Sequence, residues 1–195
     1  MSILTASSLK AGTGLASLDA LVGPRRAGLA LILGRPQSCK TGMAIQWAQS
    51  LAMERIRTLF LSCECSLRAL LMRMLCRNCG VRRRDIEGIG LSDEFDFIEL
   101  GRVLELEGGL TLESLEWPVQ ERIFDRIREL RSEGKAEAVV LDSLQFVHER
   151  AGFLRRAKSL AVELGMTFVV TVMISRMQER RIGPWRRAGD VRSPV

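Results

Sequence analysis

A short segment that could bind phosphate lies between an apolar run at 29–33 and an apolar, helix-periodic run at 42–54. In G-x-x-x-x-G-K-[ST] loops, a glycine-rich turn after a strand opens a helix whose backbone N–H groups surround phosphates. Lys40 is expected to reach the β and γ phosphates, and the Thr41 hydroxyl is expected to bind Mg²⁺. The sequence therefore indicates a site for ATP and Mg²⁺, formed by Gly34, Arg35, Pro36, Gln37, Ser38, Cys39, Lys40 and Thr41.

One position of this loop departs from the pattern. Cys39 stands where the pattern has glycine, and a side chain held at positive φ costs about 1 kcal/mol or more. Nucleotide binding could outweigh that cost. The alternative is an ordinary strand-to-helix turn that happens to carry Lys40 and Thr41.

Two carboxylates follow apolar runs and complete a candidate ATPase site. Asp142 ends the run 138–141 and could hold Mg²⁺, whereas Glu64 follows the run 58–61 and could activate the attacking water. Ligands of open α/β sheets bind at the carboxyl ends of the strands, where both residues are expected. Each has a simpler explanation, because aspartate also caps turns and Glu64 could interact with the dipole of the helix after Ser66.

Apolar runs alternate with helix-periodic segments along the chain, which predicts an α/β domain with a mainly parallel sheet flanked by helices. We expect residues 1–12 to be a loose lead-in, 13–175 the core and 176–195 an arginine-rich segment. The expected strands are 29–33, 58–61, 103–106, 138–141 and 167–173, and the expected helices are 42–54, 66–79, 113–133 and 153–164.

The composition is typical of a globular domain, with 47% hydrophobic residues and a net charge of +6. Arginine supplies 25 of the 29 basic residues, which favours phosphate-bearing partners. No apolar run reaches the roughly 20 residues needed to span a bilayer, so we expect a cytoplasmic protein without a membrane partner. Four cysteines could bind zinc, although their spacing is poor for it and buried thiols are the simpler alternative; they are Cys63, Cys65, Cys76 and Cys79.

Arginines gather near the end of the chain around Trp185. They could follow a single-stranded DNA backbone while the indole stacks on a base. A solvated tail is the competing explanation. The candidate nucleic-acid-binding residues are Arg176, Arg180, Arg181, Arg186, Arg187 and Arg192.

Several of these motifs, taken in order, resemble the C-terminal, RecA-like ATPase domain of DnaB-type replicative DNA helicases. The resemblance implies a RecA-like P-loop NTPase fold, with Lys40, Glu64 and Gln145 in catalytic roles and Thr41 and Asp142 as Mg²⁺ ligands. Gln145 would relay loss of the γ-phosphate to the DNA. The matching segments are Thr13-Gly14, Leu18-Asp19, Gly34-Arg35-Pro36, Lys40-Thr41, Ser62-x-Glu64-x-Ser66 with Leu70 and Arg73, Gly109-Leu110-Thr111-Leu112, Asp142-Ser143-Leu144-Gln145, Ser175-Arg176, Glu179, Arg181 and Asp190-Val191-Arg192-Ser193.

The resemblance also implies partners, namely single-stranded DNA and either further copies in a ring or a full-length helicase. Besides Cys39, the segment after Gln145 is shorter than in the family. The last strands and the arginine finger of that family are expected to be missing, which would leave a bare sheet edge and remove a contribution of about 10³ or more to hydrolysis.

Two other hypotheses therefore stay open. The chain could be a shortened, catalytically impaired helicase relative that acts as a nucleotide-binding or interaction module. It could also belong with other RecA-type ATPases, such as recombination mediators or clock ATPases, because Asp142-Ser143 fits them too.

Overall fold

The computed structural model of the chain describes residues 12–22, 27–88, 109–115 and 119–174. Its centre is a five-stranded sheet with the order β1-β5-β4-β2-β3, in which every neighbouring pair is parallel. The strands are β1 Gly28–Gly34, β2 Thr58–Ser62, β3 Leu110–Ser114, β4 Ala138–Asp142 and β5 Thr167–Met173.

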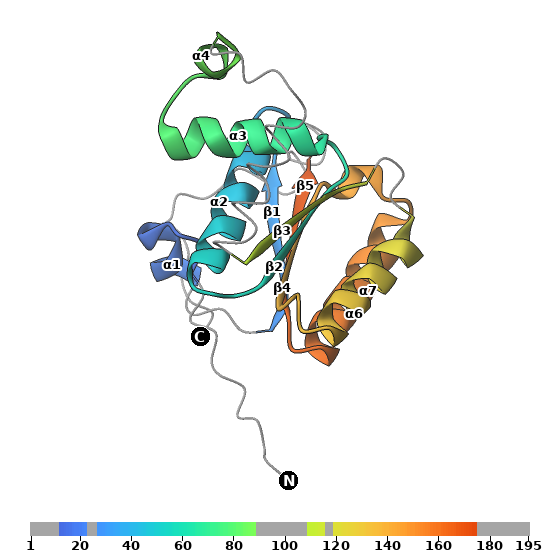
Figure 1. Ribbon diagram of the computed structural model, residues 1–195. Helices are drawn as coiled ribbons and strands as arrows, with labels where there is room; N and C mark the ends of the chain where they lie inside the picture. Colours follow the sequence, from blue (N-terminus) through green and yellow to red (C-terminus); the bar gives the residue numbers. More distant parts are fainter. Residues whose placement is uncertain (1–11, 23–26, 89–108, 116–118, 175–195) are drawn as a thin grey trace, which may run out of the picture.

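Helices cover both faces of this sheet (Figure 1). On one face lie α1 Ala16–Val22, α2 Lys40–Met53 and α3 Leu67–Cys79, with the short α4 Arg83–Gly88 beyond α3. The other face is covered by α6 Gln120–Ser132 and α7 Arg150–Glu163, and the 3-10 helix η1 Leu144–Phe146 follows β4.

The apolar pattern of the central strands follows from this layering. All five residues of β2 and of β4 are buried, because a parallel strand with helices on both sides has no face left for water. One core cluster fills the space under α2 and α3, and the other lies under α6 and α7. Trp47 belongs to the first cluster and is 2% exposed.

Local sequence signals set the ends of α3, the helix that passes over the carboxyl end of the sheet. The Ser66 hydroxyl accepts a hydrogen bond from the backbone N–H of Ala69 at 3.3 Å, which caps the first turn. Gly80 ends the helix at a φ of 66°, a conformation that glycine adopts without steric cost. The helix predicted at 66–79 is thereby confirmed.

The prediction for residues 103–133 was partly wrong. A strand, β3, occupies Leu110–Ser114 and α6 begins at Gln120, whereas we expected a helix throughout 113–133. Leu110 and Leu112 are buried and alternate with partly exposed neighbours, the period-two pattern of a strand. The strand expected at 103–106 lies outside the described residues.

The P-loop strand β1 lies at one edge of the described sheet. It pairs with β5, and among the described residues no strand pairs with its other edge. Leu31 and Leu33 are accordingly 43% and 41% exposed. No helix in the described part of the chain is long and apolar enough to cross a membrane.

Candidate nucleotide-binding site

The phosphate loop joins β1 to α2 and folds around the side chain of Lys40. The Lys40 ammonium donates a hydrogen bond to the carbonyl oxygen of Arg35 at 2.6 Å. Gly34 leaves room for two side chains at the start of the loop, since a Cβ there would lie 2.2 Å from the Ser38 Oγ and 3.1 Å from the Lys40 Cγ and would displace both. All eight predicted loop residues are thus contiguous with the end of β1 and the first turn of α2.

Cys39 adopts the backbone conformation for which the loop pattern uses glycine. Its φ is 60° and its ψ is 26°, directly before the first residue of α2, and Gln37 also has a φ of 60°. The folding free energy of the chain therefore includes the cost of a side chain at positive φ. The Cys39 side chain is exposed.

A cavity of about 560 Å³ lies over the loop. It brings together side chains that are far apart in the sequence, because their strands end at the same edge of the sheet. The cavity is lined by residues 36–42 and by Ile45, Glu64, Arg73, Arg77, Gln145 and Met173.

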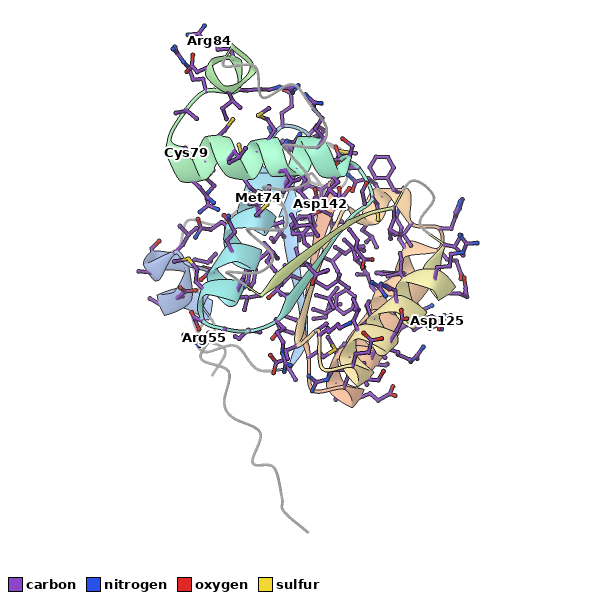
Figure 2. All side chains as sticks on the ribbon, viewed as in Figure 1. Arg55, Met74, Cys79, Arg84, Asp125 and Asp142 are labelled. Carbon is purple, nitrogen blue, oxygen red and sulfur yellow. The ribbon has the colours of Figure 1, made fainter. Side chains whose placement is uncertain are left out.

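Asp142 is the last residue of β4 and is only 1% exposed. The Thr171 hydroxyl on the neighbouring strand β5 donates a hydrogen bond to its Oδ1 at 2.5 Å. Its Oδ2 is buried and has no hydrogen-bond partner within the described chain. A buried carboxylate oxygen without a donor suits a hard divalent cation, so the residues present fit Mg²⁺. Figure 2 places Asp142 at the end of the sheet beneath α3, whereas Arg84 and Asp125 lie on outer helices.

Glu64 follows β2, which is paired with β4 so that Ser62 lies opposite Asp142. The Glu64 side chain is exposed and lines the cavity. Its Oε2 accepts a hydrogen bond from the hydroxyl of Ser143 at 3.2 Å. The first turn of α3 is capped by the Ser66 hydroxyl and not by the Glu64 carboxylate.

Gln145 lies on η1 and reaches β5. Its Oε1 accepts a hydrogen bond from the backbone N–H of Met173 at 3.4 Å, and its backbone carbonyl accepts one from the Arg150 guanidinium at 3.1 Å. The side chain therefore lies between the ends of β4 and β5, at the same cavity as Glu64.

The turn after β2 holds two thiols close to these carboxylates. Burial, together with the negative charge of Asp142, raises the pKa of Cys63 to about 12. Burial also raises the pKa of Cys65. The carbonyl of Cys65 accepts hydrogen bonds from the hydroxyls of Ser62 and Ser114. All five cysteines are free thiols, and no metal-binding group of side chains occurs in the described ranges.

Sequence reasoning gave no site role to several residues that the fold brings here. Ser143 and Thr171 bond to the two carboxylates, and Arg77 lines the cavity. The spacing of Arg73 and Arg77, one helical turn apart, was the available signal for Arg77. Six predicted DNA contacts lie outside the described residues, namely Arg176, Arg180, Arg181, Arg186, Arg187 and Arg192.

The family model for the DnaB-like helicase C terminal domain matches residues 11–193. The chain belongs to this family. Its resemblance to DnaB-type helicases, inferred from the motifs, is thereby confirmed. A comparison with curated proteins found no match.

Two solved structures share the fold of this DnaB-like domain. The first is an ATPase domain, which superimposes with a TM-score of 0.73 at 18% identity, over 93% of this chain and 71% of that one. The second is a DnaB-like replicative helicase, solved in a study of its interactions with primase, with a TM-score of 0.72 at 19% identity. That match covers 93% of this chain and 47% of the helicase, so this DnaB-like domain spans about half its length. The RecA-like α/β fold is confirmed.

Proposed function

We propose that this DnaB-like domain binds ATP together with Mg²⁺, hydrolyses the ATP and acts on single-stranded DNA. The observation that carries the proposal is the gathering of Lys40, Glu64 and Gln145 around one cavity of about 560 Å³. Asp142 ends β4 at the same edge of the sheet, opposite Ser62 in the register with β2. Membership of a helicase family favours this function over the alternative that the loop is an ordinary strand-to-helix turn that binds no ligand.

Each residue has a proposed role that follows from its chemistry. The backbone N–H groups of residues 36–41 hold the phosphates, and Lys40 exchanges its bond to the Arg35 carbonyl for one to the β and γ phosphates. Thr41 and Asp142 would hold Mg²⁺, which neutralises charge on the phosphates when bound. Glu64 accepts the proton of the attacking water, and Gln145 contacts the γ-phosphate side.

The path from the nucleotide to DNA is proposed to begin at Gln145, because that side chain bonds to the last residue of β5. The chain continues from β5 into the segment with the six candidate DNA-binding arginines. Assembly into a ring, or association with a full-length helicase, belongs to the same proposal. The interaction with primase was described for the related helicase, and we do not extend it to this domain.

A second candidate function is nucleotide binding without efficient hydrolysis. The observation that favours it is Cys39, an exposed side chain in the loop where the pattern has glycine. In this case the domain would bind nucleotide as an interaction module. Binding and turnover must therefore be measured separately.

The test is a calorimetric titration of the purified chain with Mg²⁺ and a slowly hydrolysed ATP analogue. We expect micromolar binding that Lys40→Ala abolishes and that Lys158→Ala, a matched change on the exposed face of α7, leaves unchanged. Phosphate release with and without single-stranded DNA then separates the two functions. DNA-stimulated release that Glu64→Gln removes supports the ATPase, whereas binding without release supports the module. A folded chain that does not bind would overturn both.

A further inference from the structure

Arg77 lies where two cavities meet on the P-loop face of the sheet. The first is the cavity of about 560 Å³ described above, and the second has about 550 Å³. The residues that line both cavities are Ser38, Cys39, Lys40, Gly42 and Arg77. Among the described residues, Arg77 is therefore the one outside the loop and the first turn of α2 that borders both.

The two cavities differ in the chemistry of their other walls. Glu64 and Gln145, the groups proposed to act at the γ-phosphate, line only the first. The second is lined instead by Leu15, Ile32, Leu33, Met43 and Gln46, a largely apolar set. If the γ-phosphate lies beside Glu64 and Gln145, as proposed above, the second cavity lies on the side of Lys40 away from the γ-phosphate, toward the rest of the phosphate chain. In P-loops this is the end where the helix N–H groups hold the α and β phosphates.

The Arg77 side chain is tethered but retains unused donors. Its Nη1 donates a hydrogen bond to Gln49 Oε1 on α2 at 2.8 Å, and Gln49 in turn donates to Asn78 Oδ1 at 3.2 Å. Across the described ranges, neither Arg77 nor Arg73 pairs with a carboxylate. A guanidinium has five N–H donors in a planar fork, which matches phosphate oxygens.

We infer that Arg77 contacts the α-phosphate of the bound nucleotide, in the same chain as the P-loop. The inference rests on the proposed nucleotide binding and adds a contact that the loop pattern does not contain. Gln49 holds the guanidinium at the side of α2, and the remaining N–H groups are available to a phosphate oxygen. Arg77 therefore contributes to binding of diphosphates and triphosphates alike.

The experiment compares the affinities of Mg²⁺-ADP and of the Mg²⁺-bound ATP analogue by calorimetry in wild type, Arg77→Ala and Arg77→Gln. We expect both variants to lose about tenfold in affinity for each ligand, the usual range for a lost charge-assisted contact. The ratio of the two affinities stays unchanged because both ligands carry the α-phosphate. Arg155→Ala, on the opposite face of the sheet, controls for net charge.

Gln49→Ala separates a direct contact from a structural one. It removes the tether but keeps the guanidinium, so we expect a loss of less than about threefold. A loss as large as that of Arg77→Ala would mean that Arg77 acts only by joining α3 to α2, and would overturn the contact. Circular dichroism and thermal unfolding of each variant identify any that fail to fold, and Arg77→Gln, whose amide can still donate to Gln49, keeps the test valid if Arg77→Ala unfolds.

The outcomes also distinguish this inference from the proposed function. Wild-type binding that Lys40→Ala abolishes and both Arg77 variants leave intact overturns only the role of Arg77. If the Arg77 variants lose affinity for the ATP analogue but keep their affinity for ADP, Arg77 acts at the γ-phosphate, and the α-phosphate assignment is overturned. Absence of binding by the folded wild type overturns both.

Discussion

The hydroxyl of Ser143 donates a hydrogen bond to Oε2 of Glu64 at 3.2 Å and so joins the residues that follow β4 and β2. Ser143 is fully buried, whereas Glu64 is exposed. A buried donor of this kind restricts the position of a carboxylate that would otherwise sample several rotamers. The proposed general base is therefore positioned by the residue next to the proposed Mg²⁺ ligand.

Ser143→Ala is expected to slow ATP turnover about fivefold while leaving nucleotide affinity within about twofold. The reason is that the carboxylate remains but is less well oriented toward the attacking water. Glu64→Gln should reduce turnover by about 100-fold or more, because general-base catalysis contributes roughly 10²–10⁴. Steady-state phosphate release measures both effects. Ser159→Ala on the exposed face of α7 is the matched control, and an equal slowing in that variant would contradict a specific role for Ser143.

Thr171→Val is expected to lower the free energy of unfolding by about 1–3 kcal/mol, because it leaves Asp142 Oδ1 buried without its donor. Thr167 on the same strand provides a sharp control. Its hydroxyl is buried and has no hydrogen-bond partner in the described structure, so Thr167→Val should be neutral or stabilising. Urea unfolding of the two variants checks the difference. Equal destabilisation by both variants would show that the hydrogen bond to Asp142 adds nothing to the free energy of unfolding.

Cys39→Gly is expected to raise the free energy of unfolding by up to about 1 kcal/mol, because it relieves the side chain at positive φ. Nucleotide affinity should change by less than about threefold, since the loop already has the required conformation. Arg55→Gly, at a φ of 63° after the end of α2, should give the same stabilisation away from the cavity. A gain of about tenfold in affinity in Cys39→Gly alone would mean that the thiol obstructs the phosphates, and would favour the impaired relative.

The buried thiol of Cys63 predicts a loss of stability in alkali. Its pKa is about 12 in the folded chain against an ordinary value of 9.0, so the neutral thiol is favoured by folding. Its contribution is complete below pH 9 and is lost as the pH rises toward 12, with a slope of up to about 1.4 kcal/mol per pH unit.

Urea unfolding at a series of pH values from about 8 to about 11 measures this slope. Cys63→Ala should flatten the slope, although Cys65 retains a smaller contribution of the same sign. Cys79→Ala, at an exposed thiol, should leave it unchanged. Parallel curves for wild type and Cys63→Ala would contradict the burial effect.

The parts of the site that the sequence predicts are those built from local patterns. An apolar run followed by a polar residue predicts where a parallel strand ends, and this places Lys40, Glu64 and Asp142 at one edge of the sheet. The helix of α3 follows from Ser66 at its start. Each of these signals lies within a few residues of the feature it predicts, so it can be recognised from one sequence alone.

The parts that the sequence did not predict depend on non-local contacts. The strand β3 has only a short alternating pattern of its own, Leu110 and Leu112, and its place in the sheet is set by its pairing with β2. The bond between Thr171 and Asp142 depends on β5 lying beside β4. Likewise Arg77 reaches the cavity only because α3 packs beside α2, through a bond to Gln49.

The strand β5 has a further consequence, which is mechanical. Its last residue, Met173, bonds to Gln145, and the backbone N–H of Ile174 donates a hydrogen bond to the carbonyl of Gly34 at 3.1 Å. A pull applied at Ile174 would first load these two bonds, one on each side of the candidate site, and then the ladders that join β5 to β1 and β4. Tension there would be transmitted to the first residue of the P-loop before it reached the core, so single-molecule pulling from that end would report nucleotide occupancy as a change in rupture force.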